Sequence, residues 1–514
     1  MTITLAALTQ GLSSEFLLGD PQTLVDDIVY DSSQGAPGKV FVALPGRHVD
    51  GHLYIADAYA RGVRQFVVER WPEEPDYGTD VTVVRVDDSH YALALMSQRL
   101  FDFPDRKMTV VAITGTKGKT TVSYMIKAVC EAAGKKVGLI GSTGAYYGST
   151  FVKLHNTTPQ SYELHRMMAG MVDEGVDIAI LEASSQGFAM HRTAGIHFDV
   201  GVYTNIARDH ISATEHANFT EYFMCKKRIF SQSDVTVVNR DAALYTQIVA
   251  GVVCPIRTYG FATHSTYQGV STNVSYDSDT FQTTFTCRTP TATGEFTIHL
   301  PGSYNISNAL AAIAVADILG IPLSACKSGL AKARVPGRTE MLDIPAPYTI
   351  LIDFAHNQIS LAALFEAVKA YSPRRILTVF GLEGDRSSVR RFDCGEILAR
   401  ESAYTILADA SPRSDDPDQI IADIATGIER AGGHGTYEVI RDRHQAIPAM
   451  LRRAQPHDLV LLVGKGSVIW EEIWGVDYPM DERDIVQDFF ANEQGTAEPG
   501  TNEPGTETIS PQPS

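Results

Sequence analysis

The chain has 514 residues, of which 44% are hydrophobic and 20% are charged, which is typical of a globular protein in water. This length is too great for one compact core and predicts roughly three domains. The net charge of −18 argues against a nucleic-acid-binding protein, because neutralising phosphates requires a basic face.

Segments that would place the chain in or across a membrane are not expected. No run of about 18 apolar residues occurs, and no basic residues precede the short apolar stretch at the N-terminus, so we expect no signal peptide. The six cysteines are scattered, with neither a CxxC pair nor the spacing of a zinc site. We therefore expect a cytoplasmic protein with reduced, mostly buried thiols.

The first two predicted domains are α/β units. Residues 1–107 form the smaller one. From residue 108 a buried apolar run leads into a glycine-rich turn and a helical pattern over 120–133. Helix-like segments separate most later apolar runs, which is typical of a parallel sheet. The strands predicted in these two domains lie at 40–44, 65–68, 81–86, 108–113, 137–140, 178–181, 200–203 and 235–238.

The remaining sequence adds hairpins, a third domain and a tail. Residues 262–300 are rich in Thr and Ser and alternate in polarity, which predicts antiparallel hairpins inserted in the central domain. A third α/β unit begins at residue 338. Residues 492–514 contain Pro, Gly and acidic residues without Lys or Arg, which predicts disorder. The strands predicted in the third unit lie at 349–353, 376–380, 404–408 and 459–463.

The segment TGTKGKTT, at 114–121, lies between a predicted strand and a predicted helix. In this context backbone N–H groups and a helix N-terminus bind a polyphosphate. We expect Lys119 to reach the outer phosphates and the Thr120 hydroxyl to bind Mg²⁺. The standard pattern has Gly where this chain has Ile113, so the loop is a shortened variant. A glycine-rich turn with a surface lysine is the alternative.

This loop resembles the ATP loop of the Mur ligases, amide-forming enzymes of peptidoglycan precursor synthesis. Other motifs agree in order and spacing over nearly the whole chain apart from its tail, and residues 30–52 resemble the UDP-binding domain of the third Mur ligase. The remaining matches are NTTP at 156–159, EASSQGFAMHR at 182–192, DH at 209–210, YFMCK at 222–226, LPGSYNISN at 300–308, VPGR at 335–338 and DFAHN at 353–357.

The resemblance implies an α/β fold of three domains. These are a UDP-binding domain (1–107), a central ATP-binding domain with a P-loop ATPase-like parallel sheet (108–337) and a Rossmann-like domain for the amino acid and ATP (338–491). Residues 492–514 form the predicted tail.

The resemblance also implies four catalytic residues, Lys119, Glu182, His210 and Lys226. Glu182 and His210 are the implied Mg²⁺ ligands, together with Thr120. Lys226 corresponds to the lysine that the family carbamylates with CO₂, a reaction that needs a neutral amine and is helped by burial. The alternatives are a helix-capping Glu182, a turn histidine at 210 and a solvated basic cluster at 226–228.

Two further groups of residues correspond to ligand contacts in the family. Asn305 belongs to the first group, the ATP contacts, and has an alternative role as a cap of the helix that follows it. The implied ATP contacts are Gly115, Thr116, Lys117, Gly118, Lys119, Thr120, Thr121, Asn305, Arg338, Asp353 and His356. The implied contacts of the nucleotide-linked substrate are Ser32, Ser33, His48, Thr157, Thr158, Ser184 and Arg192. The chain departs from the family in having Phe354 for Tyr and Ser33 for the Arg of a DSR motif.

The incoming amino acid is the least determined ligand. Its implied contacts are Arg391, Ser411, Arg413 and Gly464. Arg413 matches the last residue of the DNPR motif of enzymes for meso-diaminopimelate, but the Asp-Asn pair is absent. Val468 replaces the Glu of their GKGHE motif, which removes a carboxylate that would hold the distal ammonium. We therefore expect L-lysine or L-ornithine, with meso-diaminopimelate as the alternative.

The implied reaction joins this amino acid to UDP-N-acetylmuramoyl-L-alanyl-D-glutamate (UDP-MurNAc-L-Ala-D-Glu). ATP phosphorylates the D-glutamyl side-chain carboxylate, and the amine attacks the acyl phosphate. The expected enzyme is a cytoplasmic monomer that binds neither nucleic acid nor membrane. A folylpolyglutamate synthetase-like ligase and a non-catalytic ATP-binding paralogue are the remoter alternatives.

Overall fold

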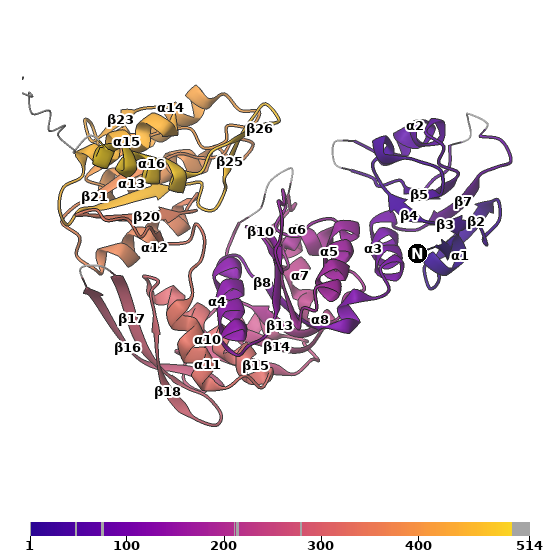
Figure 1. The fold of residues 1–514 in the computed structure, drawn as a ribbon, viewed down its shortest axis with the longest axis horizontal. Helices are drawn as coiled ribbons and strands as arrows, with labels where there is room; N and C mark the ends of the chain where they lie inside the picture. The colour runs from indigo at the N-terminus through magenta and orange to yellow at the C-terminus, as the bar shows by residue number, and fades with distance from the viewer. Residues whose placement is uncertain are drawn as a thin grey trace, which may run out of the picture. The chain divides into compact units, whose positions relative to one another are not determined.

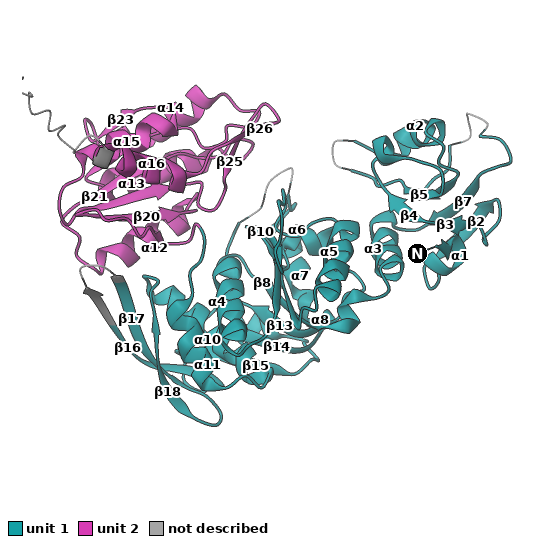
Figure 2. Cartoon of the chain, in the orientation of Figure 1, with its two compact units in different colours: residues 1–336 teal, residues 337–514 magenta. Residues whose placement is uncertain are grey.

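The structure is a computed structural model that describes residues 2–46, 49–72, 77–209, 211, 215–277 and 280–495. It contains two compact units, residues 1–336 and 337–514 (Figure 2). The predicted border at residue 107 lies inside the first unit, so the division of that unit into two domains stays a prediction. No helix among the described residues is both long enough and apolar enough to span a membrane.

The first part of unit 1 is a five-stranded sheet in the order β2-β7-β6-β5-β4, parallel except for β2. Every residue of β6 is buried, as expected of a central parallel strand. Its strands are β2 (Ser14–Leu18), β4 (Asp27–Val29), β5 (Lys39–Val42), β6 (Gln65–Val68) and β7 (Thr82–Val86). Around it lie β1 (Ile3–Thr4), β3 (Leu24–Val25), α1 (Leu5–Leu8), α2 (Ile55–Ala60), α3 (Ser89–Leu100) and the 3-10 turns η1 (Ser32–Gln34), η2 (Gly51–Tyr54) and η3 (Pro104–Lys107).

An eleven-stranded sheet forms the rest of unit 1, in the order β11-β10-β9-β12-β8-β13-β14-β15-β16-β17-β18. The run from β9 to β16 is parallel, as predicted. The strands are β8 (Thr109–Thr114), β9 (Val137–Gly141), β10 (Gly144–Tyr147), β11 (Thr150–Val152), β12 (Ile178–Glu182), β13 (Phe198–Tyr203), β14 (Ser233–Asn239), β15 (Ile256–Gly260), β16 (Tyr267–Asp277), β17 (Thr280–Arg288) and β18 (Thr293–Ile298).

Helices cover both faces of this sheet (Figure 1). Alternate residues of β8 face opposite cores: Val111 and Ile113 pack with α4, α10 and α11, whereas Val110 and Ala112 pack with α5 to α8. The helices are α4 (Lys119–Ala132), α5 (Ser161–Asp173), α6 (Ser185–Ala189), α7 (Phe219–Lys227), α8 (Ile229–Gln232), α9 (Tyr245–Val249), α10 (Ser303–Ile318) and α11 (Leu323–Lys332).

Strands at both edges of the large sheet are antiparallel. The hairpins predicted at 262–300 are confirmed as β16, β17 and β18, and β16 joins them to the parallel part through β15. The hairpin of β10 and β11 at the other edge was not predicted, because its short strands lack a continuous apolar run.

Unit 2 contains a six-stranded sheet in the order β19-β20-β24-β21-β22-β23, parallel except for β19. Its core includes apolar residues of β20, β21, β24 and α15. The strands are β19 (Glu340–Met341), β20 (Thr349–Asp353), β21 (Ile376–Phe380), β22 (Tyr404–Leu407), β23 (Tyr437–Val439), β24 (Leu459–Val463) and the separate hairpin β25 (Trp470–Ile473) and β26 (Val476–Pro479). The helices are α12 (Gln358–Lys369), α13 (Val389–Glu401), α14 (Pro417–Arg430), α15 (Arg443–Arg453) and α16 (Glu482–Gly495).

Helix α16 corrects the start of the predicted tail. It continues to Gly495, so the first four residues of the predicted tail, 492–495, belong to the helix. Residues 496–514 lie outside the described residues.

Strand order explains where the candidate site of unit 1 forms. In the parallel register Glu182, the last residue of β12, is beside Ile113 of β8, and Tyr203 of β13 is beside Thr114. The loops that follow these three strands therefore begin at one edge of the sheet, where ligands of open α/β sheets bind.

Candidate functional site

The phosphate loop has the strand–turn–helix geometry predicted from the sequence. Gly115 and Gly118 have φ angles of 148° and 89°, which strongly favour glycine. A Cβ atom on Gly115 would lie 1.9 Å from Thr204 Oγ1, and one on Gly118 would lie 2.7 Å from Asn308 Oδ1. Gly118 is the N-cap of α4 and contributes no side-chain cap, so this helix end has the form of an anion-binding site.

Two lysine ammonium groups meet at this loop. Lys119 Nζ donates to the carbonyl oxygen of Gly115 over 2.9 Å, and Lys226 Nζ donates to the same oxygen over 2.9 Å. Lys117 Nζ lies 3.2 Å from Asp209 Oδ2. The structure thus brings together the predicted residues Lys117, Lys119 and Lys226 from two helices and the loop between strand and helix.

Lys226 is buried, with 1% of its surface exposed. Burial lowers the pKa of its ammonium well below the usual value, and the positive charges of Lys119 and Lys117 lower the pKa further, against the opposing effect of Asp209. Lys227, by contrast, reaches the exposed carbonyls of Gln247 and Ala250. Lys226 is therefore not part of a solvated basic cluster.

Glu182 ends β12 as predicted, and its side chain is wholly buried. Its carboxylate accepts hydrogen bonds from Thr120 Oγ1 at 3.0 Å, from Ser142 Oγ at 3.2 Å and from the Ser142 N–H at 3.3 Å. The carboxylate does not cap α6, because Ser184 does. A buried carboxylate beside a hydroxyl is an oxygen donor set that suits Mg²⁺. His210, the third predicted ligand, lies outside the described residues.

Four residues outside the phosphate loop contact it, and none of them was predicted as a site residue from the sequence. Asn205 accepts from the Lys117 N–H at 2.9 Å and donates to its carbonyl at 3.0 Å. Thr204 Oγ1 donates to the same carbonyl at 2.7 Å. The hydroxyls of Tyr222 and Thr116 lie 2.9 Å apart, and Asn308 lies beside Gly118. Thr204 and Asn205 directly follow β13, and this position at the carboxyl end of a parallel strand could have indicated their role from the sequence.

The predicted substrate residues of the central part surround the end of β12. Thr158 is buried, and its hydroxyl donates to the Glu182 carbonyl at 2.8 Å and accepts from the Ser184 N–H at 2.9 Å. Ser184 Oγ accepts from the Gly187 N–H and so begins α6. Thr157 Oγ1 lies 2.9 Å from Ser142 Oγ. Thr157, Thr158 and Ser184 are thus within one hydrogen-bonded network with Glu182.

Arg192 is a cation with only neutral hydrogen-bond partners among the contacts that the structure describes. It donates to the Thr158 carbonyl at 2.8 Å and to Gln160 Oε1 at 3.1 Å. Burial lowers the pKa of its guanidinium, and electrostatic interactions with Tyr30 and Glu163 partly oppose this shift. Such a guanidinium suits an anionic ligand group.

The predicted uridine diphosphate contacts are described only in part. Ser32 is buried, and its hydroxyl bonds to the Asp57 carboxylate and lowers the pKa of that group. Ser33 is exposed, and its N–H donates to Asp31 Oδ1 at 2.9 Å. His48 lies outside the described residues.

The predicted nucleotide contacts fall in both units. In unit 1, Asn305 lies inside the first turn of α10, and its amide donates to the Pro301 carbonyl at 2.7 Å. The N-cap is Gly302, so the capping alternative for Asn305 is wrong.

In unit 2 a second cluster of predicted nucleotide contacts lies at the end of β20. The Arg338 guanidinium lies 4.4 Å from the Phe354 ring centre, and the rings of Phe354 and His356 are 4.7 Å apart. The Asp353 carboxylate accepts from the Thr339 N–H and the Ala355 N–H. The cluster presents a cation and an aromatic edge, which suit a nucleotide.

Two of the four predicted amino-acid contacts, Ser411 and Arg413, lie beside β25 of the hairpin formed by β25 and β26. Ser411 and Arg413 both have positive φ angles, 71° and 55°, which are uncommon for residues with side chains. The Arg413 guanidinium donates to Glu383 at 3.1 Å, and its Nε lies 3.6 Å from a Glu472 carboxylate oxygen. The hydroxyl of Ser411 accepts from the ammonium of Lys465 at 3.3 Å.

The acids next to Arg413 in sequence have other partners. Asp415 pairs with Arg391, and Asp416 caps α14. Arg391 is buried and also donates to Asp423 at 3.1 Å. Gly464 has a φ angle of 110°, and a Cβ atom there would lie 2.0 Å from the Gly381 carbonyl oxygen.

Comparison with known proteins places this arrangement in a family. The Mur ligase family catalytic domain matches residues 25–100, the Mur ligase middle domain matches 113–316, and the Mur ligase glutamate ligase domain matches 337–466. The chain is 33% identical to the UDP-N-acetylmuramoyl-L-alanyl-D-glutamate--2,6-diaminopimelate ligase of Clostridium perfringens, over 94% of this chain and 99% of that protein.

Solved structures agree in fold. A ligase structure described by the same name has a TM-score of 0.66 and 24% identity, covering 96% of this chain and all of the other. The MurF ligase from Thermotoga maritima in complex with ADP has a TM-score of 0.60 and 18% identity, covering 92% and 98%. The motifs, their geometry and these matches lead to one assignment: the chain belongs to the Mur ligase family, whose members are ATP-dependent, peptide-forming ligases.

Proposed function

We propose that the chain joins a diamino acid to UDP-MurNAc-L-Ala-D-Glu at the expense of ATP. The observation that carries this proposal is the convergence of Lys119 and Lys226 on Gly115, beside the pair formed by Thr120 and Glu182. The relative from Clostridium perfringens is named for this acceptor. Two anionic substrates must meet in such a reaction, and fixed cations reduce their repulsion.

The proposed reaction has two steps. An oxygen of the D-glutamyl side-chain carboxylate attacks the γ-phosphorus of ATP, and ADP leaves with the electrons of the broken bond. The amine of the diamino acid then attacks the acyl carbon, phosphate leaves, and the amine loses a proton. Lys119 stabilises charge on the transferred phosphoryl group, and Arg192 orients the peptide substrate through an anionic group.

Mg²⁺ is the implied metal, and the residues present fit it. Thr120 and Glu182 would hold it by oxygen atoms, and when bound it supplies neutralisation of phosphate charge. The burial of Glu182 keeps its carboxylate in one position, which favours a defined geometry for the phosphate groups.

Lys226 is proposed to carry a carbamate. Its lowered pKa provides the neutral amine whose lone pair attacks the carbon of CO₂, with release of one proton. The product is an anion close to Lys119 and Lys117. Carbamylation therefore replaces repulsion among like charges with attraction, which gives a physical reason for the buried lysine at this position.

The diamino acid has two candidates. The name of the relative supports 2,6-diaminopimelate. The charges around Arg413 support an acid without a second carboxylate, such as lysine or ornithine. Glu383 and Glu472 already neutralise the guanidinium, and a distal carboxylate would have to displace one of them.

The test is release of ADP in the presence of UDP-MurNAc-L-Ala-D-Glu and each of the three amino acids. We expect turnover that depends on both the dipeptide nucleotide and one diamino acid. An enzyme that folds, binds ATP and shows no turnover with any of them would contradict the proposal.

A further inference from the structure

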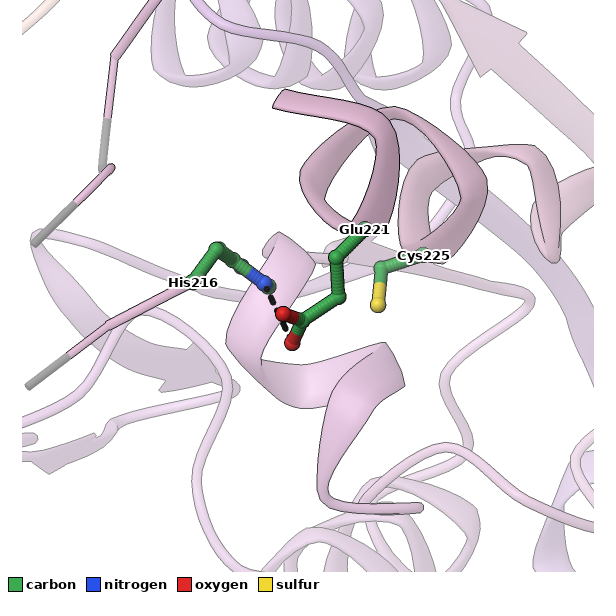
Figure 3. A group of neighbouring side chains, drawn as sticks. All are labelled: His216, Glu221 and Cys225. Atoms are coloured by element: carbon green, nitrogen blue, oxygen red, sulfur yellow. Dashed lines mark hydrogen bonds and ion pairs between the residues drawn. The ribbon is translucent and has the colours of Figure 1, made fainter. Parts of the chain in front are cut away.

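Three side chains that bind metals in many proteins lie together beside helix α7 (Figure 3). His216 comes from the segment that precedes the helix, and Glu221 and Cys225 lie one turn apart on the helix itself. One ligand atom of each residue lies within 4.8 Å of those of the other two. The imidazole, carboxylate and thiol thus share one small region.

The spacing of the His216 and Glu221 atoms fits a tetrahedral metal ion. Nδ1 of His216 lies 3.2 Å from Glu221 Oε1. Two ligand atoms at zinc distances of about 2.1 Å, separated by the tetrahedral angle, lie roughly 3.4 Å apart. The position of Cys225 four residues after Glu221 directs both side chains to the same side of the helix. The Cys225 sulfur lies within 4.8 Å of the ligand atoms of the other two residues.

The surroundings hold these ligands in place and leave an entry route. His216 is wholly buried and packs edge-on against the Tyr222 ring at 5.4 Å, and Cys225 is 6% exposed. The Glu221 side chain is 43% exposed, so an ion can approach from its side. The second oxygen of Glu221 accepts from the Ala217 N–H at 2.9 Å, which orients the carboxylate and leaves Oε1 facing His216.

We propose that His216, Glu221 and Cys225 form a site for a zinc-class divalent ion, with water as the fourth ligand. The donor set selects the ion, since a thiolate and an imidazole favour Zn²⁺ or Co²⁺, whereas Mg²⁺ prefers oxygen ligands. On binding, the Cys225 S–H bond breaks, its proton goes to the buffer, and a sulfur–metal bond forms. No oxidation or reduction is involved.

The site is separate from the proposed Mg²⁺ ligands but shares a helix with the phosphate loop contacts. Tyr222 reaches Thr116, and Lys226 reaches Gly115, from the same α7 that carries two of the three metal ligands. A bound ion ties the segment at 215–218 to this helix. It therefore stabilises the folded chain by a free energy that grows with the logarithm of the ratio of the ion's concentration to its dissociation constant.

Cobalt is the appropriate probe, because a thiolate bound to Co²⁺ produces a charge-transfer band in the near ultraviolet. Full-length protein, treated with a chelator and kept reduced, is titrated with Co²⁺ in the presence of excess Mg²⁺. We expect the band to saturate at one Co²⁺ per chain and to disappear when Zn²⁺ is added. Absence of the band, or its loss to Mg²⁺ alone, would overturn the proposal.

Substitutions of single residues identify the side chains that bind the ion. Cys225→Ser should abolish the band, whereas Cys254→Ser, at a half-buried cysteine outside the cluster, should retain it. Glu221→Gln keeps an oxygen for the Ala217 N–H and should weaken Co²⁺ binding by at least the roughly tenfold loss seen when an outer-shell partner of a metal ligand is removed. His197→Ala alters the exposed cluster of His197, Asp199 and Asp234 and should leave the band unchanged.

A second measurement tests the sulfur ligand without any substitution. If Cys225→Ser is unstable, zinc-edge X-ray absorption of the unmodified protein provides the second measurement. One sulfur neighbour near 2.3 Å is the expected result. A shell of oxygen and nitrogen alone, or an unchanged band in Glu221→Gln, would show that the ion binds elsewhere.

Discussion

Lys119 of α4 and Lys226 of α7 donate to one acceptor, the carbonyl oxygen of Gly115, each over 2.9 Å. Two ammonium groups at one carbonyl repel each other, and the burial of Lys226 reduces the screening of this repulsion by water. The lowered pKa of Lys226 relieves this repulsion in the free protein. The same relationship makes Lys226 the most informative position for mutagenesis.

Lys226→Ala should lower kcat by roughly 100-fold or more, the effect of removing one group that stabilises charge in the transition state. Bicarbonate should not restore this variant, but a short-chain carboxylate should do so in part by filling the place of the carbamate. Steady-state ADP release measures both effects.

The matched control is the neighbouring Lys227, which bonds only to exposed carbonyls among its described contacts. Lys227→Ala should keep activity within about twofold, as expected for a surface substitution. Full activity in Lys226→Ala, or equal losses in both variants, would mean that Lys226 has no special role.

Glu182→Gln tests the proposed oxygen ligand of Mg²⁺. The amide oxygen can still accept from Thr120, but the amide NH2 then faces the Ser142 N–H, so the melting temperature should fall and activity is compared at a temperature where both proteins are folded. Loss of the negative charge should raise the Mg²⁺ concentration needed for half-maximal activity and lower kcat by roughly 100-fold. Unchanged Mg²⁺ dependence of ADP release would place the metal away from Glu182.

Glu383→Gln tests what sets the choice of diamino acid. The change frees the Arg413 guanidinium from one of its two carboxylates. The ratio of kcat/KM for meso-diaminopimelate to that for lysine should rise about tenfold, or ~1.4 kcal/mol. Competition between the two amino acids measures the ratio, and a ratio that stays the same would remove Glu383 from the specificity site.

Lys465 should make stability depend on pH. Burial lowers the pKa of its ammonium to about 8, below the value of an unfolded chain, so the unfolded state binds more protons between the two values. The free energy of unfolding should therefore rise with pH from about 8 to about 10.4, by up to ~3 kcal/mol. Urea unfolding across this range checks the slope, and Lys465→Met should lack this contribution.

Strands with mainly apolar runs could be predicted from the sequence. β6, β20, β21 and β24 lie at the predicted residues, because a parallel strand buried on both faces needs mostly apolar side chains. The hairpin of β25 and β26 could not be predicted in this way. Its Trp470–Ile473 strand is only half-buried, so its polarity pattern gives no clear signal.

The candidate site was predictable where one short segment carries the chemistry. The loop at 114–121 contains its own glycines, lysine and hydroxyls, and its strand–turn–helix geometry followed from them. Contacts between distant segments were not predictable. Asn308 approaches Gly118 from α10, and Glu383 reaches Arg413 across the sheet edge of unit 2, because only the folded chain makes these residues neighbours.

The two hydrogen bonds between Asn205 and Lys117 fix both the N–H and the carbonyl of one loop residue before any nucleotide arrives. A loop that is already rigid loses little conformational entropy when a phosphate binds to it. The affinity for the nucleotide then depends mainly on the contacts that form, and little on the ordering of the loop. The affinity should therefore vary with temperature as it does for a ligand that binds a preformed pocket. The amide of Asn205 thus acts on nucleotide binding through the unbound state.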